Sequence, residues 1–79
     1  MLSTRRIYKG IGERVKQIRK EKGFTQEKLA FEANLNRAYI GYVERSERKF
    51  SIETIYRISI ALKTPLSEFF DFKKKGKKI

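Results

Sequence analysis

The 79-residue chain contains no cysteine and no histidine. These absences exclude a disulfide framework and a metal site built from thiolate or imidazole ligands. We therefore expect no metal and no other cofactor. A domain of this size buries only a modest core and usually depends on disulfides, a metal or oligomerisation for stability. Of these three, the composition leaves oligomerisation.

Long hydrophobic runs are also missing. No uninterrupted apolar stretch approaches the roughly 20 residues that a membrane-spanning helix needs. The charged start of the chain, residues 1–6, is not followed by the apolar segment of a signal peptide. The sequence therefore predicts a soluble, cytoplasmic protein with no membrane partner.

The residues that build most enzyme active sites are scarce. Besides histidine and cysteine, the chain lacks a glycine-rich motif that could cradle a phosphate, and Asp71 is its only aspartate. Glu44 and Glu47 lie three residues apart among arginines, which favours ion pairing over acid–base chemistry. The sequence predicts that the protein is not an enzyme.

Acidic residues are outnumbered, 9 against 20 lysines and arginines, for a net charge of +11. A charge this large predicts attraction to a polyanion, with nucleic acid the first candidate and an anionic membrane the second. Residues 73–79 hold five lysines and are expected to form a basic, disordered C-terminal tail. Without these lysines the chain still carries +6. We expect a flexible N-terminus at residues 1–6 and one domain at residues 7–72.

Apolar spacing and helix-capping residues predict an all-α domain of five short helices. They are expected at about 7–22, from Thr25 to Asn34, and at about 37–45, 52–62 and 65–70. Gly23 and Asn34 tolerate the left-handed conformation that ends a helix. Thr25, Asn36 and Ser51 can cap helix starts, and Thr64 is expected to cap a last helix that begins at Pro65. The residues expected inside are Ile7, Ile11, Val15, Ile18, Leu29, Ala30, Ala33, Ile40, Val43, Ile52, Ile55, Ile58 and Leu62.

Two of these helices, joined by residues 34–36, form a helix-turn-helix pattern. The major groove of B-DNA is about 12 Å wide and admits one α-helix. In such a motif the first helix crosses the DNA backbone, and the second lies in the groove with its N-terminal residues at the base edges. The second helix needs small or polar residues on its outer face, and the residues at those positions are Arg37, Ala38, Gly41, Tyr42 and Arg45. Arg37 can donate two hydrogen bonds to a guanine.

Four segments carry a family resemblance: residues 11–23, 25–30, 39–40 and 43–45. On these segments the chain resembles the lambda-repressor-like (Cro/XRE) helix-turn-helix family. Residues 36–40 and 44–48, with the compact length, are most similar to the controller proteins of restriction–modification systems. The resemblance covers about residues 7–70. It implies a compact five-helix lambda-repressor-like domain and sequence-specific binding to DNA.

The resemblance also implies roles for individual residues. Gln26 would contact a phosphate and brace the recognition helix, and Arg19 and Glu44 would form a buried or half-buried ion pair. Controller proteins often have threonine where this chain has Ala38, whose methyl can touch a thymine methyl but cannot form a hydrogen bond. The residues expected to contact bases or backbone are Gln26, Asn36, Arg37, Ala38, Tyr39, Tyr42, Arg45, Ser46, Arg48 and Lys49.

An apolar cluster near the C-terminus needs a binding partner or a place in the core. Its members are Ile60, Leu66, Phe69, Phe70 and Phe72. Exposed apolar patches usually mark interfaces, and a domain this small has little room for all five. We predict a two-fold homodimer through the fourth and fifth helices, reading half-sites about 34 Å apart. The alternative is that these side chains close the monomer core.

The leading hypothesis is a transcriptional regulator that binds a pseudo-palindromic DNA operator as a homodimer and controls a restriction–modification operon. The resemblance implies activation at low occupancy and repression at high occupancy, with RNA polymerase as a further partner. Alternatives are a phage-type or antitoxin-type repressor of the same fold, and a non-specific basic interaction module. For individual residues, the alternative is that Arg37, Arg45, Arg48 and Lys49 form an ordinary solvated face and that Tyr39 and Tyr42 only pack.

Overall fold

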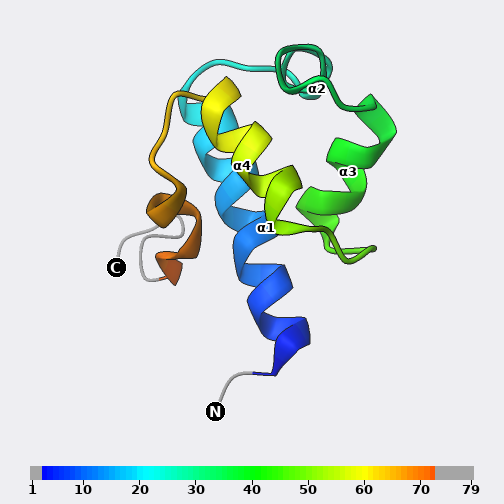
Figure 1. The fold of residues 1–79 in the computed structure, drawn as a ribbon, viewed down its shortest axis with the longest axis vertical. Helices are drawn as coiled ribbons and strands as arrows, with labels where there is room; N and C mark the ends of the chain where they lie inside the picture. Colours follow the sequence, from blue (N-terminus) through cyan, green and yellow to red (C-terminus); the bar gives the residue numbers. More distant parts are fainter. Residues whose placement is uncertain (1–2, 73–79) are drawn as a thin grey trace.

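The computed structural model describes residues 3–72. This part of the chain is all-α, as expected, but it holds four α-helices and a closing 3₁₀ helix, not five α-helices. The elements are α1 (Thr4–Glu21), α2 (Gln26–Ala33), α3 (Arg37–Arg45), α4 (Ile52–Ala61) and η1 (Leu66–Phe70). Figure 1 shows α1 along the middle of the molecule, with α2 and α3 on one side and η1 on the other. The lysine-rich tail expected at residues 73–79 lies outside the described residues.

Side-chain caps set where the α-helices begin. The expected caps are confirmed: Thr25, Asn36 and Ser51 accept hydrogen bonds from backbone N–H groups at 2.9, 2.7 and 3.1 Å. α1 begins at Thr4, not near residue 7, because Ser3 caps it in the same way at 3.2 Å. Each cap satisfies a backbone donor that the first turn leaves without a partner.

The expected start of the last helix is wrong in two respects. Thr64 caps nothing, since its hydroxyl donates to the Leu62 carbonyl at 3.0 Å. Pro65 precedes η1 and supplies no side-chain cap. In a 3₁₀ helix residues three apart lie one above the other, so Leu66 and Phe69 both face the core while Phe70 is turned outward, 43% exposed.

The hydrophobic core lies where α1 is covered by the other elements. It is formed by Ile11, Val15, Ile18, Leu29, Ala30, Ala33, Ile40, Val43, Phe50, Ile55, Ile58, Leu62 and Phe69. Ile7 and Ile52 were expected in this set but are 39% and 65% exposed. Both lie in the first turn of a helix, and the start of α1 extends beyond the elements that cover its middle (Figure 1).

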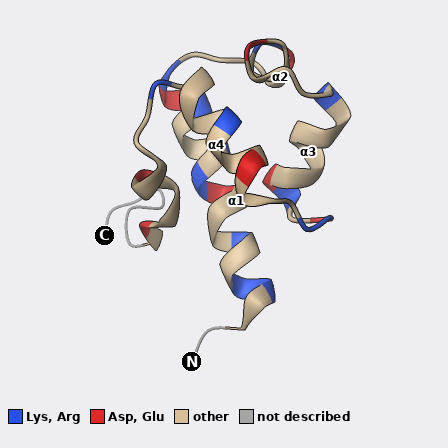
Figure 2. Cartoon of the chain, in the orientation of Figure 1, with Lys and Arg blue, Asp and Glu red and all other residues tan. Residues whose placement is uncertain are grey.

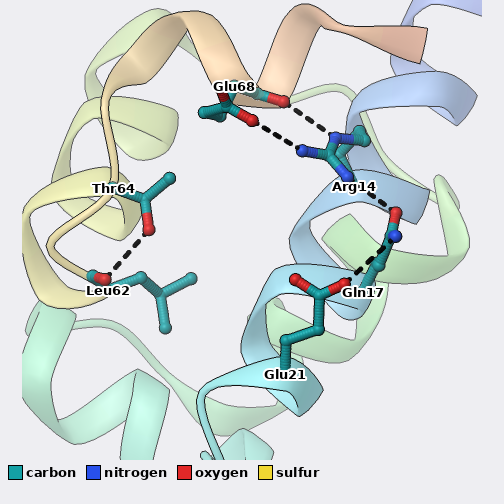
Figure 3. A network of polar contacts seen from close by, with 6 residues as sticks. All are labelled: Arg14, Gln17, Glu21, Leu62, Thr64 and Glu68. Atoms are coloured by element: carbon teal, nitrogen blue, oxygen red, sulfur yellow. Dashed lines mark hydrogen bonds and ion pairs between the residues drawn. The ribbon is translucent and has the colours of Figure 1, made fainter. Parts of the chain in front are cut away.

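A buried arginine attaches η1 to α1 (Figure 3). The Arg14 Nε donates to the Glu68 carbonyl at 2.8 Å, and its Nη2 lies 3.1 Å from a Glu68 carboxylate oxygen. The Arg14 Nη1 donates to Gln17 at 2.7 Å, and Gln17 donates in turn to Glu21. Bonds to charged groups are stronger than neutral ones, so this network holds η1 in the register that places Phe69 inside.

A close approach between α1 and α3 depends on Gly12. A Cβ atom at this position would lie 2.4 Å from the Val43 carbonyl oxygen and 3.1 Å from the Glu44 carbonyl oxygen. Both obstacles are backbone atoms, which cannot turn away as a side chain can. The two helices therefore pack at this distance only because the side chain is a hydrogen atom.

We expect Gly12→Ala to lower the free energy of unfolding by about 1–3 kcal/mol, the usual effect of overpacking a filled core. Urea denaturation followed by circular dichroism measures it. Gly23 would be a poor control because its φ of 78° strains any other residue. Lys16→Ala, on the exposed face of α1, is the matched control and should leave stability unchanged. A Gly12→Ala protein as stable as Lys16→Ala would contradict the prediction.

No helix within residues 3–72 combines the length and the hydrophobicity needed to cross a bilayer.

Candidate nucleic-acid interface

The turn between α2 and α3 has the geometry of a helix-turn-helix. Asn34 adopts the left-handed conformation with φ 58°, and the Leu35 N–H donates to the Ala30 carbonyl at 2.8 Å. Ile40 and Val43, on the inner face of α3, are fully buried. Arg37, at the start of α3, is exposed and forms no ion pair within the described part of the chain.

A buried ion pair fixes α3 against α1. The Arg19 Nε and Nη2 donate to the two carboxylate oxygens of Glu44 at 2.6 and 3.1 Å, and the side chains are 8% and 2% exposed. The third Arg19 donor, Nη1, bonds the Phe24 carbonyl at 2.8 Å. Gln26, from the first turn of α2, donates to Glu44 at 3.0 Å. Because Arg19 belongs to α1, Gln26 to α2 and Glu44 to α3, these hydrogen bonds fix the orientations of the three helices relative to one another.

The residues expected to contact DNA divide into two groups. Exposed on or beside α3 are Asn36, Arg37, Ala38, Arg45, Arg48 and Lys49. Half-buried are Gln26, Tyr39, Tyr42 and Ser46. Besides Gln26, two of the second group contact other elements: the Tyr39 hydroxyl lies 3.5 Å from Thr54 Oγ1, and the Ser46 hydroxyl donates to the Tyr8 carbonyl at 3.1 Å. Ser46 and Tyr39 therefore help to fix α3 on the domain.

Gly41 lies on the outer face of α3, as expected, one turn from the exposed residues Arg37 and Arg45, and its close approach to DNA stays a prediction. The residue is buried, and a Cβ there would lie 3.0 Å from Nη1 of Arg45. The guanidinium of Arg45 covers this part of the helix. Glycine at this position accommodates an arginine side chain of the same helix.

Arg45 is held by its neighbour Glu47. Its Nε and Nη2 lie 2.9 and 3.1 Å from the two Glu47 carboxylate oxygens. These hydrogen bonds lower the pKa of Glu47 below its ordinary value and raise the pKa of Arg45. A depressed carboxyl pKa means that the pair is complete above the ordinary glutamate range and is lost only as the pH falls through the lower value. Arg48 stacks on the Tyr42 ring, 4.3 Å from its centroid.

Basic residues, blue in Figure 2, lie at the start of α1, at the start of α3 and in the loop after α3, and others lie near the end of α1. Glutamates instead begin α2 and α4, namely Glu27 and Glu53. Residues 3–72 contain no cluster of acidic side chains placed to hold a metal ion. The arrangement suits contact with an extended anion along α3.

The helix-turn-helix family model matches residues 15–69. The chain belongs to the Cro/XRE-type helix-turn-helix family. It is 45% identical over 62 residues to the control protein C.BamHI of Bacillus amyloliquefaciens, covering 77% of this chain and 76% of that protein.

Two solved structures have the same fold. One is the restriction-modification controller protein C.AhdI from Aeromonas hydrophila, with a TM-score of 0.77 and 38% identity over 80% of this chain and 96% of that one. The other is C.Esp1396I bound to a 25 base pair operator site, with a TM-score of 0.75 and 37% identity over 82% of this chain and 86% of that one.

This helix-turn-helix domain leaves an apolar stripe exposed along α4. Ile52, Tyr56 and Ile60 recur every fourth residue and are 65%, 54% and 59% exposed. Phe70 and Ile7 lie with Ile52 around a shallow apolar cleft of about 430 Å³. Sequence reasoning missed Ile52 and Tyr56 as interface candidates, although their spacing from Ile60 was a visible signal.

The interface expected from the sequence needs one correction. Phe69 has no exposed surface and belongs to the monomer core, so it cannot contact a partner. Leu66 and Phe72 are half-buried against that core, and a Cβ at Gly10 would lie 2.8 Å from the Phe72 ring. Of the five expected residues, Ile60 and Phe70 present a large exposed surface.

Proposed function

We propose that this protein is a sequence-specific transcriptional regulator that binds a pseudo-palindromic operator as a homodimer and controls a restriction–modification operon. The observation that carries the proposal is the outer face of α3. This helix is capped at its start by Asn36, is held against α1 near its end by the Arg19–Glu44 pair, and presents Arg37 without an ion-pair partner in the described chain. Support comes from relatives that are control proteins, one of them solved on operator DNA.

In the proposed complex α3 lies in the major groove and its N-terminal residues meet the bases. Arg37 donates to a guanine, and Ala38 offers a methyl for contact with thymine. Tyr42 and Arg45 follow along the groove, while Asn36, Arg48 and Lys49 lie at its margins, within reach of the backbone. Gln26 keeps α2 and α3 at a constant angle through Glu44.

The dimer is proposed to form through the stripe of Ile52, Tyr56 and Ile60, extended by Phe70. An isologous interface uses the same patch on both subunits, and a stripe along one helix can meet its own copy across a two-fold axis. The two recognition helices would then address half-sites about one DNA turn apart. Contact with RNA polymerase at low operator occupancy is the proposed route to activation.

Selection from a random duplex library at about 150 mM salt, near physiological ionic strength, tests the proposal. We expect an enriched motif with two inverted half-sites. Arg37→Ala should weaken binding by about 1–3 kcal/mol and lose the preference for the base that it contacts. Lys20→Ala, at the far end of α1, is the control that should keep both. Binding that yields no motif and disappears with added salt would contradict the proposal.

A further inference from the structure

A basic cleft lies between the start of α1 and the loop after α3. It has a volume of about 340 Å³. Arg5 lines it from α1, and Arg48 and Lys49 line it from the loop. Nothing in the sequence pattern assigned Arg5 to the DNA interface, because the start of α1 is more than 30 residues away from the loop.

Both walls of the cleft are held in place. The Ser46 hydroxyl donates to the Tyr8 carbonyl at 3.1 Å, which joins the loop to α1. The edge of one ring in the Tyr8–Phe50 pair meets the face of the other, with centroids 4.8 Å apart. Arg48 lies on the Tyr42 ring. The cleft is therefore a property of the folded domain and needs no closure around a ligand.

The cleft carries a net positive charge, because three basic side chains line it together with one acidic side chain. Arg5, Arg48 and Lys49 are exposed, and none of them forms an ion pair within residues 3–72. Glu47 is the acidic residue of the lining, and Arg45 already occupies both of its oxygens. The cleft can therefore accept an anion without first breaking an ion pair of its own.

The first turn of α1 repeats a feature of the recognition helix. Neither α1 nor α3 has an acidic residue in its first turn, whereas Glu27 and Glu53 occupy those positions in α2 and α4. Cations at a helix N-terminus are unfavourable because of the helix dipole. In α3 the unfavourable cation is Arg37, at the end of the helix that meets DNA in the proposed complex. In α1 these cations are Arg5, which lines the cleft, and Arg6.

We propose that this cleft binds a phosphate of the DNA backbone, with Arg5 as its contact from α1. The inference rests on the proposed function, which places α3 in the major groove. In that complex Arg48 and Lys49, which line the cleft, already lie at the margin of the groove. When the start of α3 reaches the bases, the cleft at its other end meets the sugar–phosphate wall of the groove.

The test measures how the binding constant of the full-length protein depends on KCl concentration, on the selected operator and on a scrambled duplex of equal length. Each phosphate contact contributes about 0.9 to the slope of log K against log salt. Because the proposed homodimer carries two such clefts, Arg5→Gln should reduce the slope by about 1.8, and Arg5→Lys should keep it. Lys20→Gln removes the same charge about 22 Å along α1 and should leave the slope unchanged.

The outcomes separate the two proposals. If wild-type protein does not distinguish the operator from the scrambled duplex, the proposed function fails. The slope change of Arg5→Gln on both duplexes still reports whether the cleft binds phosphate. If Arg5→Gln retains the wild-type slope, or if Lys20→Gln loses as much, the cleft proposal is overturned. The preference of Arg5→Gln for the operator should equal that of wild type, since a phosphate contact carries no sequence information.

Discussion

Glu44→Ala is expected to lower the free energy of unfolding by about 3–5 kcal/mol, the usual effect of removing one partner of a buried ion pair. The Glu44 carboxylate accepts hydrogen bonds from Arg19 at 2.6 and 3.1 Å and from Gln26 at 3.0 Å. Without it, the Arg19 charge stays buried and uncompensated. Because domains have a total stability of about 5–15 kcal/mol, much of the protein should unfold at low urea concentration.

Two further variants test whether the loss of stability comes from the unpaired charge of Arg19. Glu47→Ala removes a glutamate three residues away whose ion pair with Arg45 is half exposed, and it should leave the unfolding transition unchanged. The double variant Arg19→Met with Glu44→Leu removes both charges and should recover much of the lost stability. Protein concentration must be held constant, since folding of a dimer is linked to association. A Glu44→Ala protein as stable as Glu47→Ala would show that the pair does not hold the domain together.

Ile60→Asp is expected to convert the dimer into a monomer and to weaken operator binding by at least about 100-fold, the gain that linking two binding modules provides. Ile60 is 59% exposed on the described chain, so the change should not unfold it. In an isologous interface the new carboxylate appears twice across the two-fold axis, where burial and mutual repulsion both oppose association. Sedimentation velocity reports the mass, and titration with the selected operator reports the affinity.

Phe31 provides the matched control for this prediction. It is 83% exposed and lies on α2, outside the α4 stripe of Ile52, Tyr56 and Ile60. Phe31→Asp makes a comparable apolar-to-acid change, and we expect the protein to remain dimeric. A wild-type protein that is monomeric at micromolar concentration, or an Ile60→Asp protein that stays dimeric, would refute the proposed interface. If Phe31→Asp alone became monomeric, α2 would be part of the contact surface.

Helix ends were predictable because the signals that set them act over three or four residues. The Thr25, Asn36 and Ser51 side chains bond N–H groups two or three residues later in the chain. Gly23 and Asn34 adopt positive φ as their residue types suggest. The same local rule explains the missed start of α1, since Ser3 is a cap of the same kind. Thr64 failed as a predicted cap because η1 begins one residue later than expected, with Pro65 and not Thr64 directly before it.

Burial was less predictable because it depends on what covers a helix face. Ile52 continues the spacing of Ile55 and Ile58, yet the first is 65% exposed and the other two are buried. Phe69 and Phe70 are adjacent and identical in type, but one is fully buried and the other is 43% exposed. The register of η1 decides between them, and the Arg14–Glu68 contact, across 54 residues, holds that register.

The sequence by itself determined the all-α class, the helix-turn-helix with its caps, the basic charge and the family resemblance, since each depends on residue type and short spacing. Only the tertiary structure decided that Gly12 lets α1 approach α3. It also decided that Phe69 belongs to the core and that Arg5 lies beside Arg48. These relations join positions that helix packing or side-chain orientation brings together, and no local spacing rule contains that information.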